Sequence, residues 1–287
     1  MDPITHLLPL RNHLGEGPLW NDAEQALYWV DIERGAYQRY DPASGAVVRV
    51  DIGTSLGVMR LRRSGGMVMA TGDGFQFWDP TQRVLTPIAN PEPGKGDARL
   101  NDGMVDPQGR FWAGTMAPGF SSALYRLDPD LSLHRMESRV GISNGLGWSP
   151  DGQTMYYTDS RKRVIFAYDF DPASGDIANR REWVATPNEA GTPDGLAVDS
   201  EGFIWSARWG GWKLSRYDPQ GKLEREIAMP VEFPTSCAFG GPDLDQLFIT
   251  SAWTELGEAR KDEQPWSGDL FVMPAPARGL PERKFAG

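Results

Sequence analysis

Three short phrases in this sequence place a side-chain oxygen beside a glycine at the start of an apolar run. Asn101 stands in LNDGMV, Asn144 in SNGLGW and Asp194 in PDGLAV. Taken one at a time, such pairs are ordinary turn residues. Brought together, their amide and carboxylate oxygens are the ligands that Ca²⁺, Mg²⁺ and Mn²⁺ prefer. The spacing of the phrases decides between these two interpretations.

The phrases belong to a repeat that runs through the chain. Each copy has a short apolar run, a turn of the D/S-x-x-G type, and a run of alternating aromatic and aliphatic residues, which is typical of a β-hairpin. The copies are spaced 41 to 50 residues apart, and the last is the loosest. Their anchor residues are Trp20, Leu61, Val105, Trp148, Val198 and Phe239.

A second turn signal follows each of the first five anchors by 17 to 22 residues, in YDPASG, WDP, LDPD, FDPASG and YDPQG. An Asp-Pro turn after a strand marks a further hairpin, so each unit holds about four strands. This pattern predicts an all-β fold, a six-bladed β-propeller, which we expect to form a single domain over residues 1–287. We expect the segment ITHLLPLR to pair with the last blade and close the ring.

Two other architectures have a comparable strand content: a pair of β-sandwiches and a WD40 array. The period suits WD40 repeats, but their GH and WD signature is absent. The paired glycines of kelch repeats do not recur at a fixed spacing either. Both observations favour a propeller outside these two repeat families.

In a propeller, the first strand of each blade lines the central channel, so equivalent positions converge on one axis. The position four residues before each anchor is occupied by Glu16, Gly57, Asn101, Asn144, Asp194 and Thr235. Oxygens crowded on an axis require a cation or ordered water to compensate them. Glu16, Asn144 and Asp194 are therefore the predicted metal ligands, with Asn101 as a further candidate.

Composition and charge exclude several classes of protein. The net charge of −10 and the pI of about 4.9 argue against nucleic acid or an anionic membrane as a partner. No run of 18 apolar residues occurs, and the N-terminus lacks the pattern of a signal peptide. We expect a cytoplasmic protein that is a monomer or a weak dimer.

Cysteine and histidine usage argues against two further kinds of site. The one cysteine, Cys237, is expected to be a small buried hydrophobic residue. His6, His13 and His134 all lie outside the channel position, which disfavours a structural zinc site and a Ser-His-Asp mechanism.

Arg99 adds a cationic group beside the predicted ligands. It stands two residues before Asn101, so strand alternation places both side chains on one side. A guanidinium there could bind hydroxyls or stabilise a developing oxyanion, although an ion pair at the rim is the alternative. A metal with open positions and a nearby carboxylate base would suit ester hydrolysis.

The motifs LGEGPLW, RLNDGMVDPQGRFWAGTM, ISNGLGWSPDGQTMYYTDS and PDGLAVDSEGFIW occur in this order between Leu14 and about Ala252. Together they resemble the superfamily of senescence marker protein (regucalcin), gluconolactonase and luciferin-regenerating enzyme, and in particular its bacterial sugar lactonases. The resemblance implies one divalent cation, Ca²⁺, Zn²⁺, Mn²⁺, Mg²⁺ or Fe²⁺. It assigns the ligands to Glu16, Asn144 and Asp194.

The resemblance also implies roles for individual side chains. Asp194 would be the catalytic acid and base, and Arg99 and Asn101 would contact the substrate. Some members of the family carry acidic residues after AGTMA that reach the substrate, whereas here Pro118 and Gly119 follow Ala117. The choice of substrate therefore cannot be carried over.

The sequence thus predicts a metal-dependent hydrolase of sugar lactones, an aldono-1,4- or 1,5-lactonase. Two rival functions remain: a non-catalytic propeller that binds a divalent cation, and a hydrolase of non-sugar esters or phosphotriesters on the same scaffold. Trp209, Trp212 and Trp253 could form the wall of a sugar pocket, or could pack between blades.

Overall fold

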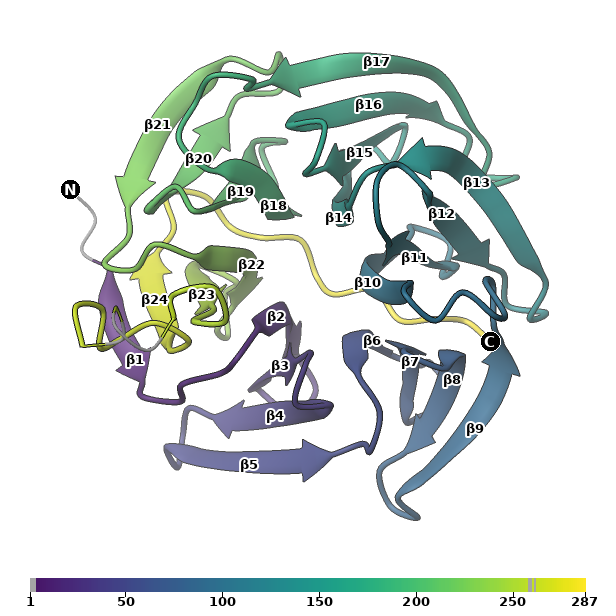
Figure 1. The fold of residues 1–287 in the computed structure, drawn as a ribbon, viewed down its shortest axis with the longest axis horizontal. Helices are drawn as coiled ribbons and strands as arrows, with labels where there is room; N and C mark the ends of the chain where they lie inside the picture. The colour runs from purple at the N-terminus through teal and green to yellow at the C-terminus, as the bar shows by residue number, and fades with distance from the viewer. Residues whose placement is uncertain (1–3, 258–259, 261) are drawn as a thin grey trace.

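The computed structural model describes residues 4–257, 260 and 262–287. In this part of the chain, 24 strands form six four-stranded antiparallel sheets, which stand around one axis like blades (Figure 1). The predicted six-bladed propeller is confirmed. No helix of the described part is long and apolar enough to span a bilayer.

The first strand of each repeat is the innermost strand of its blade, and the innermost strands of neighbouring blades contact one another around the ring. From the innermost to the outermost strand, the blades are as follows: blade 1, β2 (Gly15–Asn21), β3 (Ala26–Asp31), β4 (Ala36–Asp41), β5 (Ala46–Asp51); blade 2, β6 (Leu56–Leu61), β7 (Met67–Thr71), β8 (Gly74–Asp79), β9 (Val84–Ala89); blade 3, β10 (Arg99–Val105), β11 (Phe111–Met116), β12 (Ser122–Leu127), β13 (Leu133–Val140); blade 4, β14 (Ser143–Trp148), β15 (Thr154–Asp159), β16 (Val164–Phe170), β17 (Ile177–Ala185); blade 5, β18 (Thr192–Val198), β19 (Ile204–Trp209), β20 (Lys213–Tyr217), β21 (Leu223–Ala228); blade 6, β22 (Pro234–Gly240), β23 (Gln246–Ser251), β24 (Leu270–Pro274), β1 (Thr5–Leu8).

The repeated turn residues fold by hydrogen-bonding to their own backbone. In blade 3, one carboxylate oxygen of Asp106 accepts three backbone N–H groups of the following turn at 2.9 to 3.0 Å. The other oxygen accepts the Trp112 indole N–H at 3.1 Å. Asp199 holds the Trp205 indole in the same way in blade 5. These contacts explain why an acidic residue recurs before the second strand of a blade.

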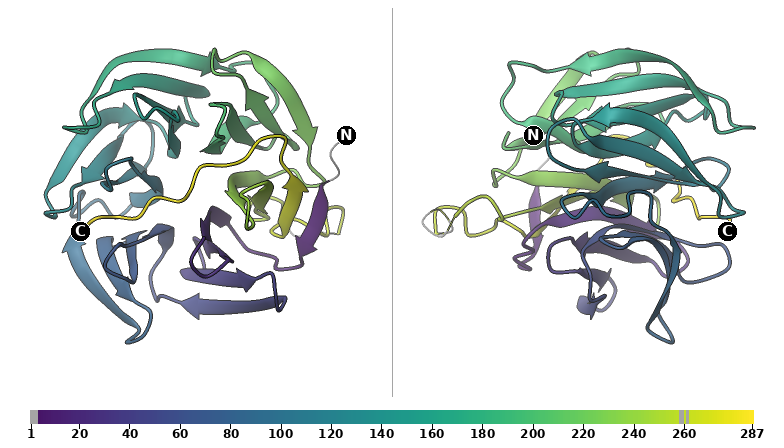
Figure 2. Two further views of the ribbon diagram at one scale, coloured as in Figure 1. Left: turned by 180° about the vertical axis from the view of Figure 1, so that it is seen from behind. Right: turned by 45° about the vertical axis from the view of Figure 1, so that its right-hand side comes forward.

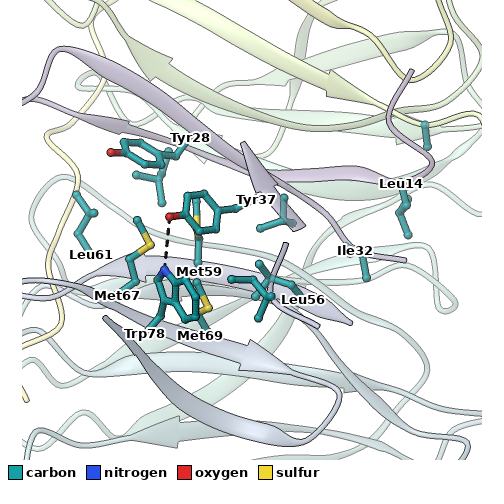
Figure 3. Packing of buried hydrophobic residues seen from close by; sticks show 14 of the residues in the cluster. Leu14, Tyr28, Ile32, Tyr37, Leu56, Met59, Leu61, Met67, Met69 and Trp78 are labelled. Atoms are coloured by element: carbon teal, nitrogen blue, oxygen red, sulfur yellow. Dashed lines mark hydrogen bonds between the residues drawn. The ribbon is translucent and has the colours of Figure 1, made fainter. Parts of the chain in front are cut away.

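Burial follows the position of a strand in its blade. The innermost strand β2 is buried throughout, whereas the outermost strand β5 is almost wholly exposed. The buried apolar residues gather in six clusters, each lying mainly between two neighbouring blades. Figure 3 shows the cluster between blades 1 and 2, where the Trp78 indole donates to the Tyr37 hydroxyl at 3.4 Å. The apolar contacts between blades therefore hold the ring together.

The two ends of the described chain meet the ring in different ways. Strand β1 pairs with β24, with Thr5 opposite Val272, so the expected closure by the N-terminal segment is confirmed. The C-terminal segment 275–287 crosses the face of the ring that is seen from behind in the left view of Figure 2. It reaches blade 2, where Phe285 is fully buried and its N–H donates to Leu61 at 2.9 Å. We call this segment the basal strap.

Every innermost strand has an irregular register with its neighbour, at or next to the position that faces the channel. The shift falls between Glu16 and Leu19 in β2, between Asn144 and Leu146 in β14, and at matching places in β6, β10, β18 and β22. A bulge lets a side chain turn away from the regular pleat. The repeat thus gives each blade one position from which a side chain could point into the channel.

Gly57 occupies this position in blade 2, where no side chain fits. A Cβ there would lie 2.5 Å from the carbonyl oxygen of Leu100 and closer still to that of Asn101. We expect Gly57→Ala to push β6 away from β10 and to lower the free energy of unfolding by about 1–3 kcal/mol. Urea unfolding measures this effect.

The matched control for this substitution is Gly96→Ala, because a Cβ at Gly96 meets no atom within 4 Å. It should leave the urea midpoint unchanged. Equal midpoints for the two variants would contradict the tight approach of β6 and β10.

Candidate functional site

A cavity of about 180 Å³ lies on the channel at the end where the innermost strands begin. Its walls include all five side chains that the sequence predicted as site residues. These residues are Glu16 of β2, Arg99 and Asn101 of β10, Asn144 of β14 and Asp194 of β18. Residues from four blades, up to 178 positions apart in the sequence, therefore share one small space.

Hydrogen bonds fix the two amide side chains in this cavity. The Asn144 amide nitrogen donates to Ser160 Oγ at 2.9 Å, which leaves its Oδ1 directed elsewhere. The Asn101 amide nitrogen donates to the Ser143 carbonyl at 2.8 Å and to Asn144 Oδ1 at 3.3 Å. Because Asn101 belongs to blade 3 and Ser143 and Asn144 to blade 4, the bonds of Asn101 connect the site across a blade boundary.

Three carboxylates are buried close together beside these amides. Burial and the neighbouring Asp102 charge raise the pKa of Glu16 from its ordinary value of 4.5 to about 8. Burial, followed by the charges of Glu16 and Asp102, raises the pKa of Asp194 well above its ordinary range. The pKa of Asp102 is also raised by burial. Burial away from water is the largest cause of all three shifts, because it disfavours the ionised carboxylates.

The residues fit a bound divalent cation. Glu16 and Asp194 offer carboxylate oxygens and Asn144 offers an amide oxygen, a donor set suited to hard cations. No group of three His, Cys, Asp or Glu side chains that could hold a metal ion occurs in the described ranges. With Glu16 and Asp194, the Asn144 amide would complete a set of three ligands. A cation at this point would compensate the buried charges.

Arg99 brings positive charge to the cavity wall. Its Nη1 donates to Asn101 Oδ1 at 2.5 Å, so the two side chains lie on one side of β10. Burial lowers the pKa of this guanidinium, while the charges of Glu33, Glu16 and Asp194 oppose that shift. Asn101 Oδ1 accepts from Arg99 and Asn144 Oδ1 accepts from Asn101, so each amide oxygen already has one donor in the cavity.

The remaining channel positions do not supply ligands. Gly57 has no side chain, and the Thr235 hydroxyl donates to the Gly15 carbonyl at 2.5 Å. Of the three histidines, His6 pairs with Asp269 and His134 with Asp128, away from the cavity.

The three tryptophans that could have formed a sugar pocket differ in position. Trp209 lines the cavity and also packs on Phe233, with ring centroids 4.6 Å apart. Trp253 lies edge-on to His13 outside the cavity walls. Trp212 is 41% exposed and is not part of the wall. Cys237 is buried as expected, and its thiol donates to the Trp205 carbonyl.

Sequence reasoning missed several charged groups around the axis. Asp102 faces the lower part of the channel, where Arg60 and Glu282 of the basal strap also lie. The Nε of Arg60 is 3.5 Å from Glu282, although the two residues are 222 positions apart. Arg60 could have been singled out from the sequence, because it is a charged residue inside the apolar run LGVMRL. Glu33 lines the same cavity as Arg99, but its place in the sequence shows no feature that would have singled it out.

Comparison with known proteins gives consistent matches over nearly the full chain. Residues 14–253 match the model of the SMP-30/Gluconolactonase/LRE-like region. Regucalcin of Xenopus laevis is 37% identical over 96% of this chain and 95% of its own length. Pentonolactonase XacC of Haloferax volcanii is also 37% identical, over 97% of each chain. The crystal structure of a calcium-binding protein, regucalcin, from Agrobacterium tumefaciens has a TM-score of 0.95 and 26% identity, and covers 99% of this chain and 97% of its own.

The crowded carboxylates lead to a pH-dependent stability. In cation-free protein, native Glu16 keeps a proton that the unfolded chain releases above a pH of about 4.5. The free energy of unfolding should therefore fall as the pH rises from about 4.5 to about 8. Adding a divalent cation at about 100 times its Kd should restore about 2.7 kcal/mol. Urea titrations with and without chelator measure both effects.

The control variant for this experiment is Glu16→Gln. It should flatten the pH dependence of the cation-free protein and weaken stabilisation by the cation. A cation-free protein whose stability rises steadily over this pH range would contradict the assigned charge crowding.

Proposed function

Because this chain belongs to the SMP-30/gluconolactonase/LRE-like family, we propose that it is a divalent-cation-dependent lactonase that hydrolyses the ring ester of a sugar lactone to an aldonic acid. The observation that carries the proposal is the convergence of Arg99 with Glu16, Asn144 and Asp194, the predicted cation ligands, on one cavity. A site that only bound a cation would not require a guanidinium directed at the same space.

The similarity to a named pentonolactonase supports hydrolysis of a lactone ester. Glu16, Asn144 and Asp194 would hold the cation, which, when bound, would supply Lewis acidity toward the lactone carbonyl. Ca²⁺, Mg²⁺, Mn²⁺, Zn²⁺ and Fe²⁺ are all candidates. The oxygen-only donor set favours the harder ions among them.

Asp194 moves the proton in this proposal. Its carboxylate takes a proton from the water that adds to the carbonyl carbon, and returns it to the ring oxygen as the ester C–O bond breaks. Burial raises the pKa of Asp194 in the cation-free protein, and a bound cation would favour the ionised form that can accept a proton. The product is the open-chain hydroxy acid. One water molecule is consumed for each ester C–O bond that is broken.

Arg99 and Asn101 orient the ring. The guanidinium presents N–H donors to the cavity, while its bond to Asn101 fixes its direction. Donors held in place before the reaction stabilise negative charge that develops on the carbonyl oxygen. The partner is thus a small polyhydroxylated lactone.

A pH-indicator assay tests the proposed function directly. Chelator-stripped protein receives each of the five cations in turn, with glucono-, xylono-, arabino- and galactonolactones as substrates. Acid release should depend on the cation and exceed the spontaneous rate. Asp194→Asn, measured at saturating cation, should lose at least about 100-fold in kcat, because it removes the acid-base group.

Asp171→Asn is the matched control, because Asp171 is an exposed turn residue on blade 4. It should leave turnover unchanged. A folded, cation-loaded protein that accelerates no lactone would favour the rival function of a cation-binding propeller. Acceleration of aryl esters or phosphotriesters alone would favour the other rival.

A second experiment on the proposed function separates substrate binding from cation binding. Arg99→Ala should lower kcat/KM on the best lactone by about 10- to 100-fold, because it removes a charged hydrogen-bond donor. The Kd of the cation, measured by calorimetry, should change much less. Equal losses in the two quantities would show that Arg99 supports the structure of the cavity and does not contact the substrate.

A further inference from the structure

Glu33 is a carboxylate at the cavity that the mechanism above does not use. It lies in the turn between β3 and β4 of blade 1 and lines the same cavity as Arg99 of blade 3. Its side chain is 44% exposed, so solvent and small molecules reach it. Among the carboxylates that sustain the charge of Arg99, Glu33 has the largest effect. The two groups therefore border one space from different blades.

Only one oxygen of Glu33 is engaged by the protein. His13 Nδ1 contacts Oε2, and the Thr254 hydroxyl donates to the same Oε2 at 3.4 Å. Within the ranges that the structure describes, no donor contacts Oε1. The carboxylate is thus held on one side and open on the other.

The groups that hold Glu33 are themselves fixed. The backbone N–H groups of Trp253 and Thr254 both donate to the His13 carbonyl at 3.2 Å. The Trp253 indole donates to the Arg11 carbonyl at 3.1 Å, and its ring lies against His13. The segment after β23 and the segment before β2 therefore form one support, which sets the direction of the Glu33 carboxylate.

A sugar hydroxyl donates one hydrogen bond and accepts others, so a pocket for a polyhydroxylated ring requires acceptors as well as donors. Arg99 only donates, and Asn101 Oδ1 already accepts from it. The loop after β11 supplies Ala117 and Pro118, whose side chains carry no acceptor. Glu33 Oε1 is an open acceptor on the wall of the cavity.

We propose that Glu33 is a specificity-determining residue whose Oε1 accepts a hydrogen bond from a hydroxyl of the lactone ring while Arg99 donates to the ring from the other side. This inference rests on the proposed function, since it names the part of the pocket that recognises hydroxyls. Blade 1 thereby supplies the acceptor that the loop of blade 3 lacks.

Glu255 provides a matched comparison. It lines the same cavity and carries the same charge, and it is also exposed. In the described part of the chain, no neighbour holds its carboxylate. Loss of charge is therefore common to substitutions at Glu33 and Glu255, whereas loss of a positioned acceptor occurs at Glu33 alone.

The test measures binding of D-glucono-1,5-lactam, a ring analogue that resists hydrolysis, to cation-loaded protein by calorimetry. Glu33→Ala should raise its Kd about tenfold or more, as expected for one hydrogen bond to a charged group. Glu33→Gln, which keeps an acceptor oxygen, should give an intermediate value. Glu255→Ala should change the Kd less than twofold. In lactone hydrolysis, Glu33→Ala should raise KM and leave kcat within threefold.

Three results would overturn the inference: equal effects of Glu33→Ala and Glu255→Ala, no effect of either, or no binding of the lactam by the wild-type protein. A matching fall in kcat and in thermal stability would assign Glu33 a purely structural role. Failure of the proposed function is visible separately in the hydrolysis assay of the wild-type protein, which would then release no acid from any lactone. Cation-dependent acid release by the wild type, with no effect of Glu33→Ala on KM or on the Kd of the lactam, would overturn this inference alone.

Discussion

The burial of like charges at the centre of the ring is the constraint on which the rest of this structure depends. Glu16, Asp102 and Asp194 stand close together with little access to water. Isolated buried carboxylates are strongly unfavourable, so the surrounding protein has to hold them in place by other interactions. Those interactions are the apolar clusters between the blades, which stabilise the ring from outside the channel.

Close packing of the innermost strands follows from the same constraint. Gly57, Gly145 and Gly195 each lie against the backbone or a short side chain of the next blade, where a Cβ would clash. Small residues at these points allow the strands to approach the axis, and the bulges in β14 and β18 direct the side chains of Asn144 and Asp194 into the channel. Geometry and charge are thus set by the same short phrases of sequence.

The sequence predicted the repeat, the number of blades and the positions that converge, because each of these depends on local patterns that recur. It also predicted ring closure by the N-terminal segment, which the pairing of β1 with β24 confirms. It did not predict Arg60 beside Glu282, or Glu33 beside Thr254, because Glu282 and Thr254 lie in segments outside the repeat, whose position no recurring pattern gives. Asp102 was overlooked because strand alternation places it away from Asn101, and the bulge in β10 changes that alternation. The catalytic and binding roles themselves remain predictions for experiment.

The basal strap affects the access of small molecules to the central channel. Leu280, Pro281 and Glu282 line the lower cavity of about 90 Å³, so the strap covers that end of the channel. In the proposed reaction, substrate and product would pass the cavity beside Glu33 and Arg99 at the other end of the channel. An acidic product leaving by this route passes the same groups that admit the neutral ring. The carboxylates of Glu33 and Glu255 on the cavity wall would repel that product while leaving the neutral substrate unhindered.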